Sequence, residues 1–357
     1  MSVFRIDMLP AREGDCLWIE YGDPPRTRHI LVDGGRQSAY ATLKQRFAAL
    51  PPDQRDFELL IVSHVDADHI EGLLKLVADP DLPVRFKDVW FNGRRHLDRL
   101  QDFGALQGEA FTQGIAAKGW QWNAAFDGAS VVIPDDGILP VKDLADGMRL
   151  TVLSPTWQKL EKLSPLWDEE LDKAGMTLRP PAPDTDRPRL EAFGALTIDD
   201  VEDAAAARFK PDDSAANGSS ICVLAEFDGH RAVLTGDAHA DIVAASLARL
   251  RGTNGRAVSL DAFKLSHHGS RGTHSVELMQ QIRCRRFLVS SDGSRHKHPH
   301  VESIARTLRN SGGGVQLVCN YQSAETSAWD QTALKEHYGY EIAFPASGEP
   351  GLARVAL

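Results

Sequence analysis

The sequence has no hydrophobic run long enough to cross a membrane. In 357 residues, no apolar stretch approaches the roughly 18–20 residues that span a bilayer. The N-terminal segment MSVFRIDMLPAREGD alternates apolar and polar residues and contains acidic residues early, unlike the continuous apolar core of a signal peptide. Both absences predict a cytoplasmic protein that does not contact a membrane.

Cysteine is scarce, and the chain has no CxxC pair. The four cysteines are widely spaced, at Cys16, Cys222, Cys284 and Cys319. This spacing predicts buried free thiols in a reducing compartment, and it excludes a disulfide framework or a zinc knuckle.

Positive charge is not in excess, and several catalytic signatures are missing. The 40 basic residues are outnumbered by 50 acidic ones, for a formal charge of −10. This balance argues against a protein that coats nucleic acid, although it permits a local basic groove. The patterns GxSxG, GxxxxGK[ST], HExxH and strand-placed GxGxxG are absent. Serine-nucleophile hydrolysis and ATP-driven chemistry therefore have no candidate site.

The pattern of the remaining sequence predicts an α/β protein. Short apolar runs bounded by Gly, Asp and Pro predict strands, at 3–10, 15–22, 28–35, 58–63, 84–91, 148–154, 221–227, 231–236, 262–266, 286–291 and 315–320. Helices are predicted over 40–50, 239–250, 276–282 and 301–310. A proline-rich and acidic stretch at about 157–216 is predicted to be a surface insertion. The whole chain, 1–357, is then one domain.

The densest group of metal-ligating residues lies in SHVDADHIEG, directly after the apolar run ELLIVS. In an extended loop, residues two apart point the same way, so His64 and Asp66 can share a metal. Asp68 and His69 then begin the next helix. The carboxylates offset the positive partial charge of the helix N-terminus, which would otherwise disfavour a cation. The pattern predicts a metal site rather than a polar helix cap.

The motif HxDxDH after an apolar strand resembles the metal motif of the metallo-β-lactamase superfamily, whose common form is HxHxDH. The aspartate variant is similar to that of ComEC-type DNA-uptake proteins and their stand-alone relatives. Further segments agree in order: ILVDGG, NGSSICVLAEFDGHRAVLTGD, FKLSHHGS and HPH. The resemblance spans most of residues 1–320 outside 157–216. It implies a four-layer αββα sandwich with two divalent metal ions, Zn²⁺ or Mn²⁺, at one edge of the sheets.

The resemblance also implies a ligand set. One metal would take His64 and Asp66, and the other would take Asp68, His69 and either His267 or His268, with His268 favoured. Asp237 would bridge both metals. The third histidine that the superfamily usually supplies to the first metal, in a PGH segment, is replaced here by Asn217-Gly218-Ser219-Ser220. An oxygen-rich first site would favour Mn²⁺ or Mg²⁺ over Zn²⁺.

Other residues are candidates for contacting a substrate. Asp68 is expected to orient an attacking hydroxide, while Lys264 and His298 would assist at the phosphate or the leaving group. Asn217, Ser219 and Ser270 are candidate substrate-binding residues, whereas Asp33 in ILVDGG is expected to hold a loop by hydrogen bonds. A basic groove could be lined by Arg94, Arg95, Arg99, Arg271, Arg295 and Lys297.

These residues predict a dinuclear metal-dependent hydrolase. Two metals lower the pKa of a bridging water and stabilise developing negative charge. The ComEC-type resemblance favours a phosphodiester substrate, DNA or a nucleotide. Two alternatives stay open: hydrolysis of a small phosphate ester or lactone, and a metal-binding module that acts through a partner protein bound at 157–216.

Overall fold

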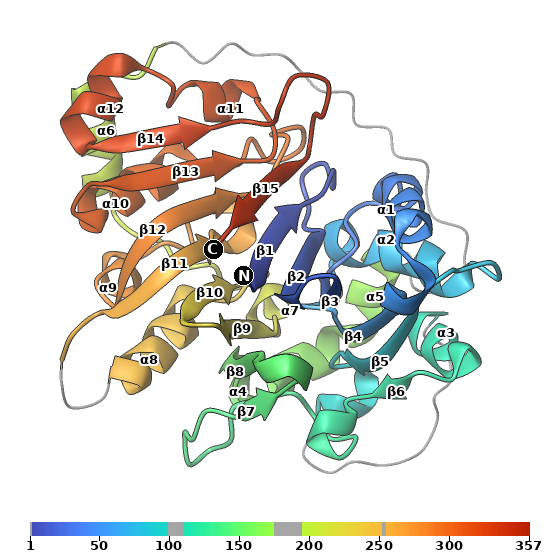
Figure 1. Cartoon of the computed structure of the whole chain (residues 1–357). Coiled ribbons are helices and arrows are strands. Elements are labelled where there is room, and N and C mark those ends of the chain that lie inside the picture. The colour runs from blue at the N-terminus through green and yellow to red at the C-terminus, as the bar shows by residue number, and fades with distance from the viewer. Residues whose placement is uncertain (1, 99–109, 175–194, 252–254) are drawn as a thin grey trace.

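The computed structural model describes residues 2–98, 110–174, 195–251 and 255–357. Two β-sheets lie face to face and helices cover their outer faces (Figure 1). In these residues no helix combines the length and apolar character that a membrane span requires. The four cysteines are buried and unpaired, as predicted.

The first sheet is an antiparallel meander that continues into parallel strands. Its order, within the described residues, is β15-β1-β2-β3-β4-β5-β6, with β3 to β6 parallel. The strands are β1 (Val3–Met8), β2 (Leu17–Asp23), β3 (Arg26–Val32), β4 (Asp56–Ile61), β5 (Arg85–Trp90), β6 (Gln121–Trp122) and β15 (Ala353–Ala356).

The second sheet repeats this arrangement. Its order is β14-β13-β12-β11-β10-β9-β8-β7, with β10 to β14 parallel. The strands are β7 (Val141–Asp143), β8 (Arg149–Ser154), β9 (Cys222–Phe227), β10 (His230–Leu234), β11 (Val258–Lys264), β12 (Ile282–Val289), β13 (Val315–Cys319) and β14 (Tyr340–Ala343). The predicted strands are present, although β11 and β12 begin earlier than expected.

The helices form the outer layers. The first sheet is covered by α1 (Ala39–Ala49), α2 (Ala67–Ala78), α3 (Ala110–Lys118), α4 (Trp157–Leu163) and α5 (Trp167–Lys173). The second sheet is covered by α6 (Ile198–Ala206), α8 (Ala240–Arg251), α9 (Val276–Met279), α10 (Val301–Ser311) and α12 (Thr332–Tyr338). Two short helices, α7 (Ala215–Gly218) and α11 (Ala324–Ser327), lie in loops.

Strand β4 shows why its sequence is apolar throughout. Leu59 and Ile61 face the other sheet, whereas Phe57 and Leu60 pack against the covering helices. A strand buried on both faces needs a continuous apolar run. Because one core lies between the sheets and one lies under each helical layer, the predicted four-layer αββα sandwich is confirmed.

The segment 157–216 differs from the expected surface insertion where it is described. Leu160 and Trp167 are buried in the core of the first sheet, and Val201 is buried in the core of the second. Both ends of the segment therefore belong to the packed domain; residues 175–194 lie outside the described residues.

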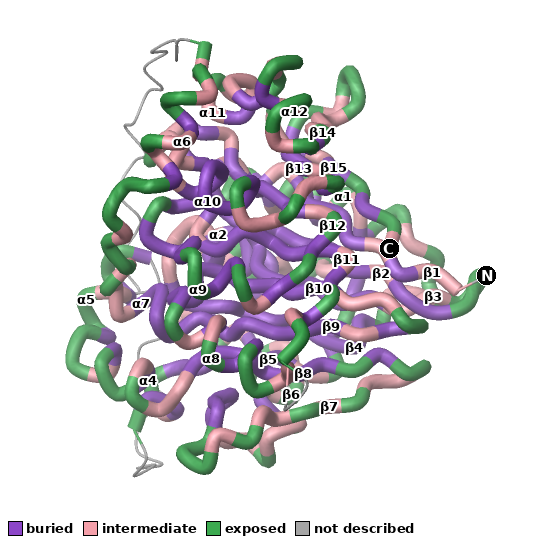
Figure 2. Tube along the Cα trace, turned by 90° about the vertical axis from the view of Figure 1, so that its left-hand side faces the viewer, coloured by how far each residue is buried: buried purple, intermediate pink, exposed green. Residues whose placement is uncertain are grey.

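The predicted metal ligands follow the carboxyl ends of strands β4, β10 and β11, where ligands bind in sheets of this kind. In Figure 2 the two termini lie on one side of the molecule, and α2, α7 and α9 lie on the other. The loops that carry the site are therefore remote from the chain ends.

Candidate metal centre

Loops from both sheets meet closely at the site. His64 lies in the loop between β4 and α2, and Asp237 follows β10. The two loops approach so tightly at Gly236 that a Cβ there would lie 2.7 Å from Ser63 Cβ, and Gly236 has a φ of +51°. Only glycine fits this position without strain.

One cluster joins His69, His268, Asp68 and Asp237. The Nε2 atoms of His69 and His268 are 3.2 Å apart. Asp237 Oδ1 lies 3.3 Å from the first and 3.6 Å from the second. Asp68 Oδ2 is 3.2 Å from His268 Nε2 and 3.7 Å from His69 Nε2. Two nitrogens and two carboxylates thus converge on one volume, which we call the second cluster.

The other oxygen of Asp237 faces a different group, which we call the first cluster. Asp237 Oδ2 is 3.8 Å from His64 Nε2 and 3.8 Å from His267 Nε2. Asp66 Oδ2 lies 3.5 Å from His64 Nε2. Asp237 therefore stands between the clusters with one oxygen toward each, which is the arrangement a bridging carboxylate requires.

His267 and His268 contribute to different clusters. Both residues and Gly269 have left-handed backbones, with φ of +48°, +53° and +85°. Such a conformation is costly for residues with a Cβ and is typical of functional loops. It turns successive rings apart, so the two histidines are both at the site rather than alternatives. The first cluster therefore contains two imidazole nitrogens, from His64 and His267. The absence of a PGH histidine had led us to expect only that of His64.

Asp33 orients two of these histidines. Its Oδ2 accepts a hydrogen bond from His69 Nδ1 (2.8 Å) and another from Ser63 Oγ (2.7 Å). Ser63 Oγ in turn accepts from His64 Nδ1 (3.0 Å). A proton held at Nδ1 leaves the lone pair of Nε2 facing the cluster, as a metal ligand requires. The loop-holding role expected for Asp33 agrees with these bonds.

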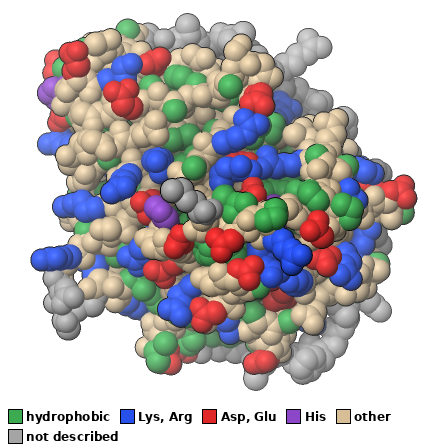
Figure 3. Space-filling view, viewed as in Figure 1, with side chains coloured by type: hydrophobic (Ala, Val, Ile, Leu, Met, Phe, Trp, Pro, Cys, Tyr) green, Lys and Arg blue, Asp and Glu red, His purple; other side chains and the backbone are tan. Residues whose placement is uncertain are grey.

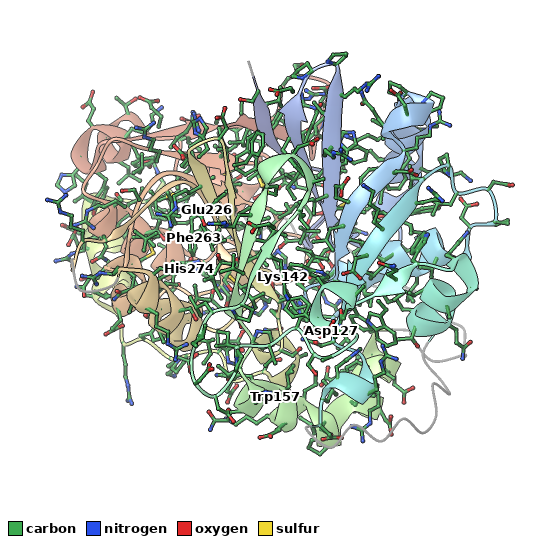
Figure 4. The ribbon with its side chains drawn as sticks, turned by 60° about the horizontal axis from the view of Figure 1, so that its bottom comes forward. Asp127, Lys142, Trp157, Glu226, Phe263 and His274 are labelled. Carbon is green, nitrogen blue, oxygen red and sulfur yellow. The ribbon has the colours of Figure 1, made fainter. Side chains whose placement is uncertain are left out.

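The remaining two histidines are held in the same way. His268 Nδ1 donates to the carbonyl oxygen of Ser290 (3.0 Å), and His267 Nδ1 donates to Asp212 Oδ2 (2.9 Å). All four rings thus point Nε2 inward. The support extends further: His274, labelled in Figure 4, accepts at Nε2 a hydrogen bond from the backbone of Ser266, the residue before His267.

Asp15 is a site residue that the sequence analysis missed. One ligand atom from each of Asp15, His69, Asp237 and His268 lies within 4.8 Å of the others. Asp15 belongs to the turn between β1 and β2, which packs so closely on α2 that a Cβ at Gly14 would lie 1.7 Å from Asp68 O. The only sequence signal is an acidic residue after glycine at the carboxyl end of β1.

The carboxylates control the protonation of the site. Burial opposes charge on His268, but Asp237 and Asp15 outweigh it and raise its pKa to about 9. Burial likewise opposes charge on His69, whose pKa Asp237 and Asp68 hold well above its usual range. Burial alone would raise the pKa of Asp237, which these histidines instead hold well below its usual range. The carboxylates therefore outweigh the cost of burial, and the site favours a proton or a cation.

The donor set fits divalent cations. His64 Nε2, Asp237 Oδ1 and Asp15 Oδ1 are buried without a hydrogen-bond partner. Leaving such atoms unpaired is costly, and buried charge is normally paired or bound to a metal. Each cluster offers imidazole nitrogens together with carboxylate oxygens, a mixture that suits Zn²⁺ and Mn²⁺.

Lys264 is placed differently from the expectation. Its side chain is buried, and Nζ lies 2.7 Å from Asp15 Oδ2 and 3.0 Å from the Leu265 carbonyl oxygen. The ammonium group is thus engaged within the protein and does not face solvent. This position fits a structural ion pair behind the second cluster better than contact with a phosphate.

Asn217 and Ser219 also have internal partners. Both are buried; Asn217 Nδ2 donates to Asp212 Oδ2 (2.7 Å), and Ser219 Oγ donates to the Ala216 carbonyl oxygen (2.7 Å). These bonds place them as support for the loop rather than as substrate contacts. Ser270 follows the histidine turn directly, and its backbone N–H donates to the carbonyl oxygen of His267 (2.8 Å).

His298 borders both clusters. It is buried, and its ring centroid lies 5.1 Å from that of His267 and 6.2 Å from that of His268. Burial, together with His267 and His268, lowers its pKa. Among the predicted candidates outside the ligand set, His298 is the one whose ring packs against both His267 and His268.

The predicted basic residues are dispersed. Arg271 contacts Glu302 and His300, at 3.3 Å each. Arg94 pairs with Asp98, and Arg95 lies over the ring of Trp122 at 4.0 Å. Arg295 is exposed and Lys297 is partly buried, in the loop that carries His298; Arg99 lies outside the described residues.

No protein-family model matches the sequence, and no curated protein matches it either. Among solved structures, the chain is similar to YhfI from Bacillus subtilis, a metallo-β-lactamase fold protein, with 12% identity over 99% of this chain and 100% of that one and a TM-score of 0.43. It is also similar to Zn²⁺-bound PqqB from Methylobacterium extorquens, with 12% identity over 97% and 88% of the chains and a TM-score of 0.42. A third is unliganded yeast PDE1, with 11% identity over 100% of both chains and a TM-score of 0.43. Likeness at this level carries no statement about substrate or mechanism.

Proposed function

We propose that this chain is a metal-dependent hydrolase that binds two divalent ions and cleaves phosphodiesters. The observation that carries the metal-dependent part is the position of Asp237, whose Oδ1 faces His69 and His268 while its Oδ2 faces His64 and His267. Two clusters that share one carboxylate suit a dinuclear site.

The proposed ligands are divided between the clusters. The first ion would be held by His64, Asp66 and His267, and the second by Asp68, His69, His268 and Asp15, with Asp237 shared. When bound, such ions act as Lewis acids and lower the pKa of water.

The chain itself would supply orientation. The side chain of Asp68 is 20% exposed, so it can contact both the second cluster and a water molecule. His69 and His268 hold the pKa of Asp68 well below its usual range against the opposing effect of burial. An ionised carboxylate accepts hydrogen bonds, so Asp68 would orient the attacking water. His298 would contact the leaving group.

The phosphodiester assignment is supported by the HxDxDH motif and by basic residues in the loops that carry His298 and Ser270. A phosphodiester transition state spreads negative charge over oxygens that need donors beyond the metals. Arg295 and Lys297 lie in the same loop as His298, and Arg271 follows Ser270. The face shown in Figure 3 interleaves basic and acidic side chains.

The test uses bis(p-nitrophenyl) phosphate and DNA after removal and re-addition of metal. We expect turnover with Mn²⁺ or Zn²⁺, none with chelator, and none in Asp68→Ala with either metal. DNA cleavage through basic loops should weaken steeply as salt rises, whereas cleavage of the small ester should respond little. Hydrolysis of a lactone without phosphodiester cleavage in any metal would refute the substrate class. Phenotypes and partner capture that survive Asp68→Ala would favour a binding module instead.

A further inference from the structure

We propose that Asp212 is the positioning residue of the first cluster, and that residues 207–217 form a strap that fixes it against the histidine turn. This inference rests on the proposed metal binding. It identifies Asp212 as the residue through which the first cluster depends on the strap.

Asp212 is bonded on both oxygens. Its Oδ2 accepts from His267 Nδ1 (2.9 Å) and from Asn217 Nδ2 (2.7 Å), and its Oδ1 accepts from the backbone N–H of Ser214 (3.0 Å). The carboxylate cannot rotate without breaking these bonds. Its fixed direction keeps the His267 ring turned so that Nε2 faces Asp237.

The strap is anchored to the second half of the fold. The backbone N–H of Asp212 donates to the Gly272 carbonyl oxygen (3.0 Å), and a Cβ at Gly272 would lie 2.9 Å from Asp212 N. Upstream, Arg306 Nη2 donates to the Ala207 carbonyl oxygen (3.1 Å), and its guanidinium lies 5.3 Å from the ring centroid of Phe209. Arg306 is itself buried in α10. The position of Asp212 is therefore set from both sides.

The effect should be selective for the first cluster. The side chain of His267 is 25% exposed, whereas those of His64 and His69 are 0% and that of His268 is 2% exposed. Packing holds the three buried rings, but His267 depends more on its hydrogen bond. The second cluster has separate support, because His69 is held by Asp33 and His268 by a backbone carbonyl.

The experiment measures metal content of the full chain, loaded separately with Mn²⁺ and Zn²⁺ and dialysed against graded chelator. The variants are Asp212→Ala and Asp212→Asn, whose amide oxygen still accepts a hydrogen bond. The matched control is Asp213→Ala, the exposed neighbour in the same strap. Anomalous scattering identifies which position keeps its ion, and thermal unfolding of the metal-free proteins reports structural damage.

We expect Asp212→Ala to lose one of two ions, with affinity at that position lowered about 10–100-fold, as is typical when the hydrogen-bond partner of a metal-bound histidine is removed. Asp212→Asn should fall between Asp212→Ala and the parent, and Asp213→Ala should match the parent. The remaining ion should lie beside His69 and His268. Retention of both ions at parental affinity, or equal loss of both with early unfolding of the metal-free variant, overturns this inference alone. A parent that binds no ion overturns the proposed function as well.

Discussion

The imidazoles of His69 and His268 face each other with their Nε2 atoms 3.2 Å apart. Their Nδ1 atoms donate to oxygens that can only accept, a carboxylate and a backbone carbonyl. In the neutral tautomers two lone pairs therefore meet, surrounded by carboxylates. A proton or a cation must occupy this volume, and the two compete for it.

The first prediction concerns this competition. In the metal-free protein the pKa of His268 is raised to about 9, so the ring carries an extra proton at neutral pH. Metal binding must displace that proton, so affinity should rise with pH up to about 9, and binding at neutral pH should release protons. Calorimetry in buffers of different ionisation enthalpy measures the release. His268→Ala should release fewer protons, and the exposed His337→Ala should match the parent. Affinity that is flat with pH would contradict the shifted pKa.

The second prediction concerns the shared carboxylate. Asp237→Ala should lower metal content at both positions, because its oxygens face different clusters. Elemental analysis after dialysis measures the loss. Asp241→Ala is the control, since this aspartate lies in the adjacent helix α8 and its side chain is 64% exposed. An Asp237→Ala protein with full occupancy would show that the carboxylate does not bridge.

Much of the fold followed from local patterns. Apolar runs such as 58–63 and 221–227 are buried on both faces, so their composition alone predicts strands. Strands β14 and β15 were not predicted, because each has only four residues, too few to show a clear apolar run or alternation. Their pairing with β13 and β1 is set by tertiary packing, which periodicity cannot report.

The site was predictable where its residues are close in sequence or match a family motif, as Asp237, His267 and His268 do. One motif of six positions contains His64, Asp66, Asp68 and His69, so the sequence alone indicates these ligands. Asp15 and Asp212 belong to no recognisable motif and are distant in sequence from the histidines, and only folding brings them together. For Lys264, proximity in sequence was misleading. Its closeness to His267 suggested a substrate contact, but its ion-pair partner Asp15 is 249 positions away.

The third prediction concerns Asp33. Its carboxylate holds His69 directly and holds His64 through Ser63, so it supports both clusters. Asp33→Ala should therefore weaken both ions, each by about 10–100-fold. Chelator competition measures the affinities. Asp23→Ala, an exposed aspartate at the end of β2, serves as the control. Loss of a single ion would mean that the link through Ser63 has no effect on His64.

The last prediction separates two roles for Lys264. If Lys264 only neutralised a substrate phosphate, Lys264→Met would raise KM and leave stability unchanged. The structure instead buries its Nζ 2.7 Å from Asp15 Oδ2. Removing one partner of a buried pair leaves an uncompensated charge and costs about 3–5 kcal/mol. We therefore expect Lys264→Met to lower the free energy of unfolding by about that amount, measured by urea denaturation of the metal-free protein.

Lys75→Met, an exposed lysine in α2, should have little effect on stability. The double variant Asp15→Asn with Lys264→Met should recover part of the loss, because it removes the stranded carboxylate as well. The double variant also tests Asp15 as a ligand: stability should rise relative to Lys264→Met while affinity at the second cluster falls. A Lys264→Met protein with parental stability and a raised KM would instead assign Lys264 to substrate binding and would contradict the structural ion pair with Asp15.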